Sequence, residues 1–217
     1  MLDLNDAALI ALALVACEPE QPARTPVNAP TAPAPGTLRL PVDGEWRVFR
    51  THYGNKRDQS SAVDLVLNAP YPQGRRPLAE FPTYGQPVVA DGPGVVVLLV
   101  DGVPDNALGT TNFYDAHGNH LVIDHQDGTF SLFAHLKPGG MRVRIGERVS
   151  AGQPIGACGN SGRSSMPHLH WQVMDHPHAH VARGVPIPIS PYKRNGGHSR
   201  ERLERGDVIR ALEAPSR

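Results

Sequence analysis

The stretch HLVIDHQDGTFSLFAHL, residues 120–136, has the pattern of a β-hairpin. Two short apolar runs, residues 120–125 and 130–136, are bounded by turn residues, which is typical of strands. Between them, Asp127 and Gly128 form the dipeptide that most strongly favours a tight hairpin turn. The stretch therefore predicts two strands joined by a short turn.

The same pattern recurs on both sides of this hairpin. GVVVLLV at residues 94–100 and HLHWQV at residues 168–173 are further short apolar runs that indicate strands. Glycine and proline number 22 each, which favours many turns and short elements. No sustained helical period occurs before the charged carboxyl-terminal tail. The sequence therefore predicts a mostly β domain with short loops.

The amino terminus has the features of an export signal. Residues 7–16 form an apolar run that is too short to span a bilayer, and it ends in LVAC, which resembles a bacterial lipobox. That resemblance implies cleavage before Cys17 and lipidation of its thiol. Asp3 and Asp6 occupy the region where a signal peptide usually carries lysine or arginine. The alternative is a short apolar segment with an incidental cysteine.

The chain divides into four segments by composition. We expect a signal peptide over residues 1–17, a Pro-rich linker over 18–37, an ordered domain over 38–192 and a charged tail over 193–217 that forms a peripheral helix. Lysine plus arginine and aspartate plus glutamate each total 21, so the charge favours no nucleic-acid partner. The membrane would be reached only through the lipid anchor, as in a periplasmic or cell-envelope lipoprotein.

The run MPHLHWQV at residues 166–173 places two histidines two positions apart. In a strand, successive side chains point to opposite faces, so His168 and His170 share one side while Leu169 and Trp171 face the core. Two imidazoles on one exposed face indicate a metal ligand beside a catalytic group. The alternative is a pair of surface histidines on a half-buried strand.

A catalytic zinc usually takes three protein ligands, so His170 needs two companions. Asp64 lies in an apolar run, where a carboxylate must be exposed, paired or bound. An outward-facing aspartate on an edge strand is the alternative. His135 ends a predicted strand, and strict alternation puts it on the face of Phe133, opposite Ala134.

Residues 118–173, GNHLVIDHQDGTFSLFAHLKPGGMRVRIGERVSAGQPIGACGNSGRSSMPHLHWQV, closely resemble the LytM/lysostaphin-type zinc metallopeptidases. YGQPVVADGPGVVV at residues 84–97 and AVDLVL at 62–67 add to the resemblance, which runs from about residue 50 to residue 173. It implies the duplicated hybrid motif fold, a sandwich of β-sheets with a barrel-like shape. It also implies a zinc cofactor and hydrolysis of peptides in bacterial peptidoglycan.

Carried over by position, the resemblance makes Asp64 and His170 zinc ligands. It makes His135 and His168 the pair that steadies the attacking water and the developing oxyanion. The commonest family pattern has a histidine four residues before the aspartate, and this chain has Ser60 there.

Some relatives instead carry a more distant histidine before a Gln-x-x-Ala-x-Asp run. THYGNKRDQSSAVDL, residues 51–65, resembles that variant and makes His52 the third zinc ligand. The turn-prone residues between His52 and the aspartate would let the loop fold back to the metal. The alternative is a solvated loop histidine.

Two functions follow from the resemblance. The first is a zinc endopeptidase that cuts peptidoglycan outside the cytoplasm. The second is an inactive domain of the same fold that binds the wall or activates a separate hydrolase. Residues 101–118 are the expected wall of the substrate groove. We expect the three histidines of DHPHAH, residues 175–180, to be solvated or at most weakly metal-binding, and a second metal site is the alternative.

Overall fold

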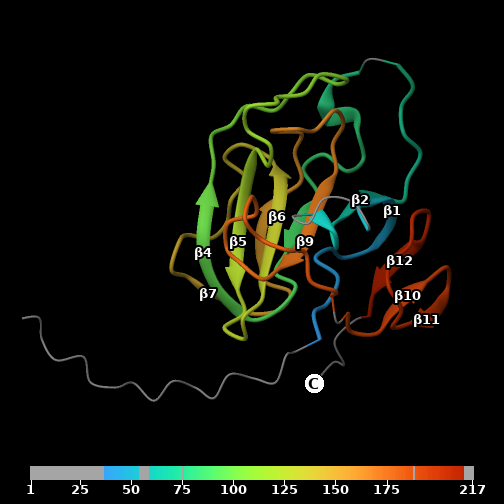
Figure 1. The fold of residues 1–217 in the computed structure, drawn as a ribbon. Helices are drawn as coiled ribbons and strands as arrows, with labels where there is room; N and C mark the ends of the chain where they lie inside the picture. Colours follow the sequence, from blue (N-terminus) through green and yellow to red (C-terminus); the bar gives the residue numbers. More distant parts are fainter. Residues whose placement is uncertain (1–36, 54–58, 75, 188, 213–217) are drawn as a thin grey trace, which may run out of the picture. The chain divides into compact units, whose positions relative to one another are not determined.

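The computed structural model describes residues 37–53, 59–74, 76–187 and 189–212 (Figure 1). The prediction of a mostly β fold is confirmed, because these ranges contain no α-helix and their helical residues belong to short 3-10 turns such as Leu78–Glu80. The strands are β1 (Glu45–Thr51), β2 (Val63–Leu67), β3 (Pro87–Val89), β4 (Gly94–Val100), β5 (Asn119–Asp124), β6 (Phe130–Leu136), β7 (Arg148–Val149), β8 (Pro154–Ala157), β9 (Leu169–Met174), β10 (Tyr192–Arg194), β11 (Gly197–Ser199) and β12 (Val208–Ala211).

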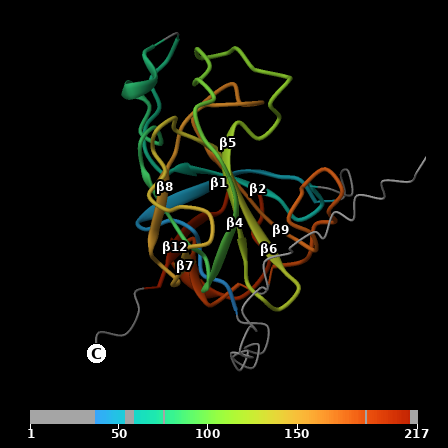
Figure 2. The same ribbon diagram turned by 90° about the vertical axis from the view of Figure 1, so that its left-hand side faces the viewer.

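Ten of these strands form one antiparallel sheet in the order β11-β10-β12-β1-β2-β9-β6-β5-β4-β7. The four runs that the sequence identified as strands are β4, β5, β6 and β9, and they lie side by side with β2 in Figure 1. Strands β3 and β8 pair separately as a second, smaller sheet, and β8 is labelled in Figure 2. The second sheet gives the large one a partner layer.

The main core lies between the two sheets. Val88 of β3 and Ile155 of β8 belong to the same buried apolar cluster as Phe133 of β6 and Trp171 of β9. Leu169 and Val173 join that cluster, so the predicted alternation of β9 is confirmed. The opposite face of the large sheet carries a smaller apolar cluster, which leaves room there for polar side chains.

The expected helix in the charged tail is wrong. Strand β12 pairs with β1 through Trp46 and Ile209, and β10 pairs with β12 through Tyr192 and Ala211. Tyr192 and Ile209 are each 1% exposed and belong to the main core. Burial of these side chains as an extension of the sheet outweighs the local helical preference of the tail.

The expectations for the amino terminus concern residues outside the described ranges. These are the signal peptide over residues 1–17, with Cys17, and all but the last residue of the linker over 18–37. Within the described part of the chain, no helix is long and apolar enough to cross a membrane.

Candidate metal centre and catalytic cleft

Strand pairing brings the two central residues of the site together. Asp64 of β2 and His170 of β9 are direct cross-strand partners, and the next pair, Val63 and Trp171, faces the core. Direct partners share one face of a sheet, so Asp64 and His170 both point away from the main core. His170 Nδ1 lies 2.8 Å from Asp64 Oδ1.

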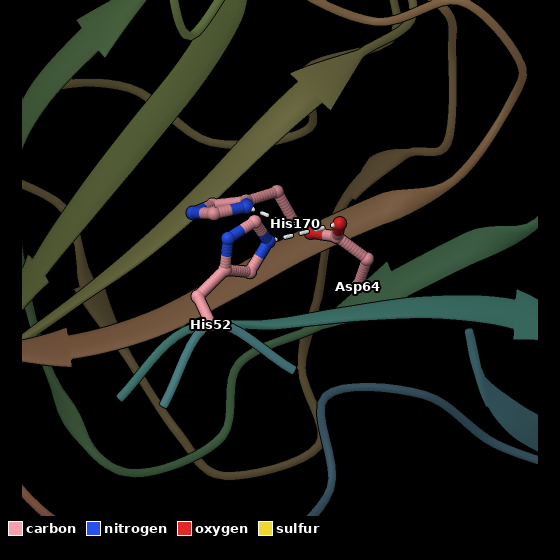
Figure 3. A group of neighbouring side chains, drawn as sticks. All are labelled: His52, Asp64 and His170. Carbon is pink, nitrogen blue, oxygen red and sulfur yellow. Dashed lines mark hydrogen bonds and ion pairs between the residues drawn. The ribbon is translucent and has the colours of Figure 1, made fainter. Parts of the chain in front are cut away.

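His52 reaches the same point from the end of β1. Its backbone N–H donates to the carbonyl of Ala62 at 3.0 Å, which extends the β1–β2 ladder past Thr51 and Val63. This pairing makes His52 a diagonal neighbour of Asp64, and its Nε2 lies 3.0 Å from Asp64 Oδ2. Figure 3 shows the three side chains converging on one point. The hairpin register therefore positions His52.

Ser60, which stands where the common family pattern has a histidine, is turned elsewhere. Its hydroxyl donates to the carbonyl of Gly184 at 3.3 Å, and Ser60 does not line the cleft described below. The structure thus places the His52 side chain, and not that of Ser60, beside Asp64.

The three converging residues fit a divalent metal ion. Potential ligand atoms of His52, Asp64 and His170 all lie within 4.8 Å of one another, and two imidazoles with one carboxylate are a donor set of catalytic zinc sites. Burial alone would raise the pKa of Asp64, but hydrogen bonds to His170 and His52 hold that pKa well below its usual value. The carboxylate is therefore ionised at neutral pH, as a metal ligand must be.

A β-bulge brings His135 to the site, so the expectation that it shares the face of Phe133 is wrong. Leu136 pairs with Asn119 and Phe133 with Leu121, which leaves two residues of β6 opposite one of β5. His135 adopts a positive φ of 61°, and this breaks the alternation. Its ring centroid lies 5.7 Å from that of His170, although Phe133 stays in the core.

His135 and His168 form a pair with fixed ring orientations. Their ring centroids are 4.7 Å apart. His135 Nδ1 lies 2.9 Å from the carbonyl oxygen of Ser161, and His168 Nδ1 lies 2.9 Å from that of Met166. Because a carbonyl only accepts, both Nδ1 atoms carry a proton, and the lone pair of each neutral ring is on Nε2. Burial lowers the pKa of both rings, so both are neutral at pH 7.

The loop before β9 contributes residues that the sequence analysis missed. Ser164 Oγ lies 3.1 Å from His168 Nδ1 and donates to the amide oxygen of Asn160 at 2.7 Å. The amide of Asn106 donates to the carbonyls of Asn160, Gly162 and Ser164. Small polar residues in a turn-rich run gave no sequence signal for this role.

All five predicted site residues line one cleft of about 580 Å³. Ala116 and His117, at the end of the expected groove wall, also line it, and so does His180 of the DHPHAH run. His176 and His178 lie outside the cleft lining and are exposed, as expected. Burial lowers the pKa of His117 to about 3, so this ring adds no positive charge at neutral pH.

Comparison with known proteins identifies the family of this chain. Residues 80–182 match Peptidase family M23, a range that includes His135, His168 and His170 and leaves His52 and Asp64 outside. The chain belongs to this family of metallopeptidases. Peptidoglycan DD-endopeptidase ShyA of Vibrio cholerae is 30% identical over 69% of this chain and 28% of that protein.

Other relatives have different names. Glycyl-glycine endopeptidase ALE-1 of Staphylococcus capitis is 32% identical over 55% of this chain and 30% of that protein. Lipoprotein NlpD of Yersinia enterocolitica is 37% identical over 41% of this chain and 77% of that protein. The catalytic domain of EnpA from Enterococcus faecalis is 25% identical, with a TM-score of 0.43 over 68% of this chain and 94% of that domain. The chain thus spans less than a third of ShyA and of ALE-1.

Proposed function

We propose that this protein is a zinc-dependent endopeptidase that hydrolyses peptide bonds of bacterial cell-wall peptidoglycan. The observation that carries the proposal is the convergence of His52, Asp64 and His170 beside His135 and His168 in one open cleft. The family relationship supports the same activity, since two relatives from different bacteria are endopeptidases by name.

His52, Asp64 and His170 would hold the metal ion. When bound, zinc polarises a carbonyl oxygen and lowers the pKa of water towards neutrality. The ionised Asp64 supplies the negative charge of the ligand set, and its buried position, 4% exposed, keeps that charge from being screened. Because His52 and His170 both lie within hydrogen-bonding distance of this carboxylate, their rings are already aimed at the metal position.

The histidine pair would move the proton. A neutral Nε2 on His135 or His168 can accept a proton from the attacking water, and the resulting N–H can donate to the oxyanion or to the leaving amine. Two imidazolium rings with centroids 4.7 Å apart would repel each other, so the pair holds one added proton at a time. This property suits a group that takes a proton and then returns it.

The test is hydrolysis of purified peptidoglycan by the zinc-supplied full chain, with the released peptides measured by mass spectrometry. We expect the parent and Ser60→Ala to release peptides at similar rates, and His170→Ala to lose at least about 10³-fold. Equal rates for the parent and His170→Ala would rule out the site. A parent that neither binds zinc nor hydrolyses, but stimulates a separate wall hydrolase, would establish the activator alternative instead.

We also propose that the protein is exported and anchored by a lipid on Cys17. The LVAC sequence supports this, and the name of the relative Lipoprotein NlpD agrees with it. Metabolic labelling with a fatty-acid analogue should mark the parent and not Cys17→Ala. Equal labelling of both proteins would exclude the anchor.

A further inference from the structure

Arg50 lies in the same row of the sheet as the metal centre. A bulge at Phe49 shifts the register of β1, so that Val48 pairs with Leu65 in the core and Arg50 pairs with Asp64. Direct partners share a face, which puts the Arg50 side chain beside Asp64 on the cleft side. Arg50 and Phe49 are both exposed, and both line the cleft.

Arg163 reaches the cleft from the loop before β9. Its guanidinium carbon lies 5.4 Å from the centroid of the Phe113 ring, and its backbone N–H donates to the carbonyl of Ala116 at 3.1 Å. The carbonyls on both sides of it, those of Gly162 and Ser164, accept hydrogen bonds from the Asn106 amide. This loop therefore holds Arg163 in a defined position.

Close packing of two backbone segments also holds the Arg163 loop in place. Gly162 has a φ of 72°, and a Cβ on it would lie 2.3 Å from the backbone nitrogen of Gly118. A side chain at this position would force the two segments apart. The loop that presents Arg163 is thus locked against the end of the groove wall.

The charges that face the cleft are unbalanced. The lining holds two arginines, Arg50 and Arg163, and a single carboxylate, that of Asp64. Asp64 already contacts two imidazoles and would bind the metal ion. Neither arginine forms an ion pair with any carboxylate in the described ranges. A zinc ion would add further positive charge to the same cleft.

Guanidinium groups recognise carboxylates through paired, charge-assisted hydrogen bonds, which are stronger than bonds between neutral groups. Phe113 and Tyr114, which are 68% and 99% exposed, add apolar surface on the loop that Arg163 contacts. A glycine bridge offers no side-chain carboxylate to this surface. A branched wall peptide with a free carboxylate near the scissile bond offers the matching group.

We propose that Arg50 and Arg163 form a carboxylate-binding subsite, which selects peptides that carry a free carboxylate beside the scissile bond over neutral glycine-rich peptides. The subsite rests on the proposed endopeptidase function and names its substrate class. Arg50 and Arg163 bind and orient the substrate, and the chemistry stays with the histidine pair.

The test uses three peptides and the zinc-supplied full chain. The first is a branched peptide with a D-alanyl amide bond beside a free α-carboxylate, the second is its carboxamide counterpart, and the third is pentaglycine. We expect the parent to prefer the carboxylate peptide by at least about tenfold in kcat/KM. Arg50→Gln and Arg163→Gln should each reduce that preference. Arg142→Gln is the matched control, because Arg142 is exposed and lies outside the cleft lining.

Equal cleavage of the carboxylate and carboxamide peptides would overturn the subsite and leave the endopeptidase function intact. Equal losses on both peptides in Arg50→Gln and Arg163→Gln would also overturn it. If the parent cleaves no peptide, the endopeptidase function fails, and binding of the first two peptides, measured by isothermal titration calorimetry, decides the subsite. Tighter binding of the carboxylate peptide, lost in the arginine variants and weakened by salt, would support it, and equal binding would exclude it.

Discussion

Two histidine–aspartate clusters lie on opposite faces of the same sheet. One is the candidate metal centre around Asp64 and His170. The other surrounds Asp91, whose Oδ2 accepts hydrogen bonds from Ser131 Oγ at 2.5 Å and Trp171 Nε1 at 2.8 Å. Trp171 follows His170 in β9, so one strand supplies both clusters.

The two clusters differ in how their polar groups are satisfied. In the buried network, His125 Nδ1 bonds to the carbonyl of Pro93 and Nε2 to the Ser131 hydroxyl, so neither nitrogen is available to a metal. Burial raises the pKa of Asp91, whereas hydrogen bonds outweigh burial and lower the pKa of Asp64. The same residue types thus build a sealed structural network on one face and an open ionised site on the other.

The comparison predicts different outcomes for the same substitution at the two aspartates. Asp64→Ala should lower hydrolysis by at least about 10³-fold and abolish stoichiometric zinc binding, because it removes the charged ligand. Asp91→Ala should keep the zinc and lower the free energy of unfolding by about 1–3 kcal/mol, because the Trp171 indole loses its acceptor. Zinc analysis and denaturant unfolding measure both effects. Loss of zinc in Asp91→Ala alone would reverse the assignment.

The next effect separates proton transfer from metal binding. His135→Ala and His168→Ala should each lower kcat by about 10²–10³-fold, because each removes a group that exchanges a proton with the substrate or water. Both variants should keep one zinc per chain. Zinc loss from either variant, measured with the activity on the same preparation, would place that histidine among the ligands.

A smaller effect tests whether His52 is the third ligand. His52→Ala should weaken zinc affinity by more than about 100-fold. This loss is larger than the loss of affinity that follows removal of a residue that only supports a metal ligand through a hydrogen bond. Ser60→Ala, the matched control, should bind zinc like the parent, because the Ser60 hydroxyl contacts Gly184. Competition with a chromophoric chelator measures both affinities, and equal affinities for the parent and His52→Ala would remove His52 from the site.

The smallest effect is the acid sensitivity of the metal-free protein. Because folding lowers the pKa of His135 and His168, the unfolded chain binds more protons below a pH of about 6.5. The contribution of the two histidines to folding stability is present above that pH and is lost as the pH falls. Tm should therefore drop by about 5 °C between pH 7 and pH 5. The drop should be smaller in His168→Asn. A parent Tm that stays constant or rises on acidification would contradict these pKa shifts.

Short-range patterns were enough to predict strands β4, β5, β6 and β9 and the buried face of β9. The alternating run of β9 fixed the face of Trp171, and the turn at Asp127 and Gly128 fixed the hairpin. The resemblance then indicated His52, Asp64 and His170, which the structure brings together. The strand and turn signals depend on local spacing, which a single chain shows directly, whereas the ligand assignments depend on the family resemblance.

Features that depend on tertiary contacts could not be predicted. The bulge at His135 arises from pairing with a partner strand, and the tail strands form because Tyr192 and Ile209 find space in the core. The Asp91 network joins residues that are 80 positions apart in the case of Trp171. No local periodicity reports such long-range contacts.

The most direct test is a zinc-edge anomalous map from crystals of the zinc-supplied full chain. The account predicts one strong peak at about 2.0–2.2 Å from His52 Nε2, a carboxylate oxygen of Asp64 and His170 Nδ1. A peak that lies away from these three atoms, such as one among His176, His178 and His180, would contradict it. So would the absence of any peak in the cleft.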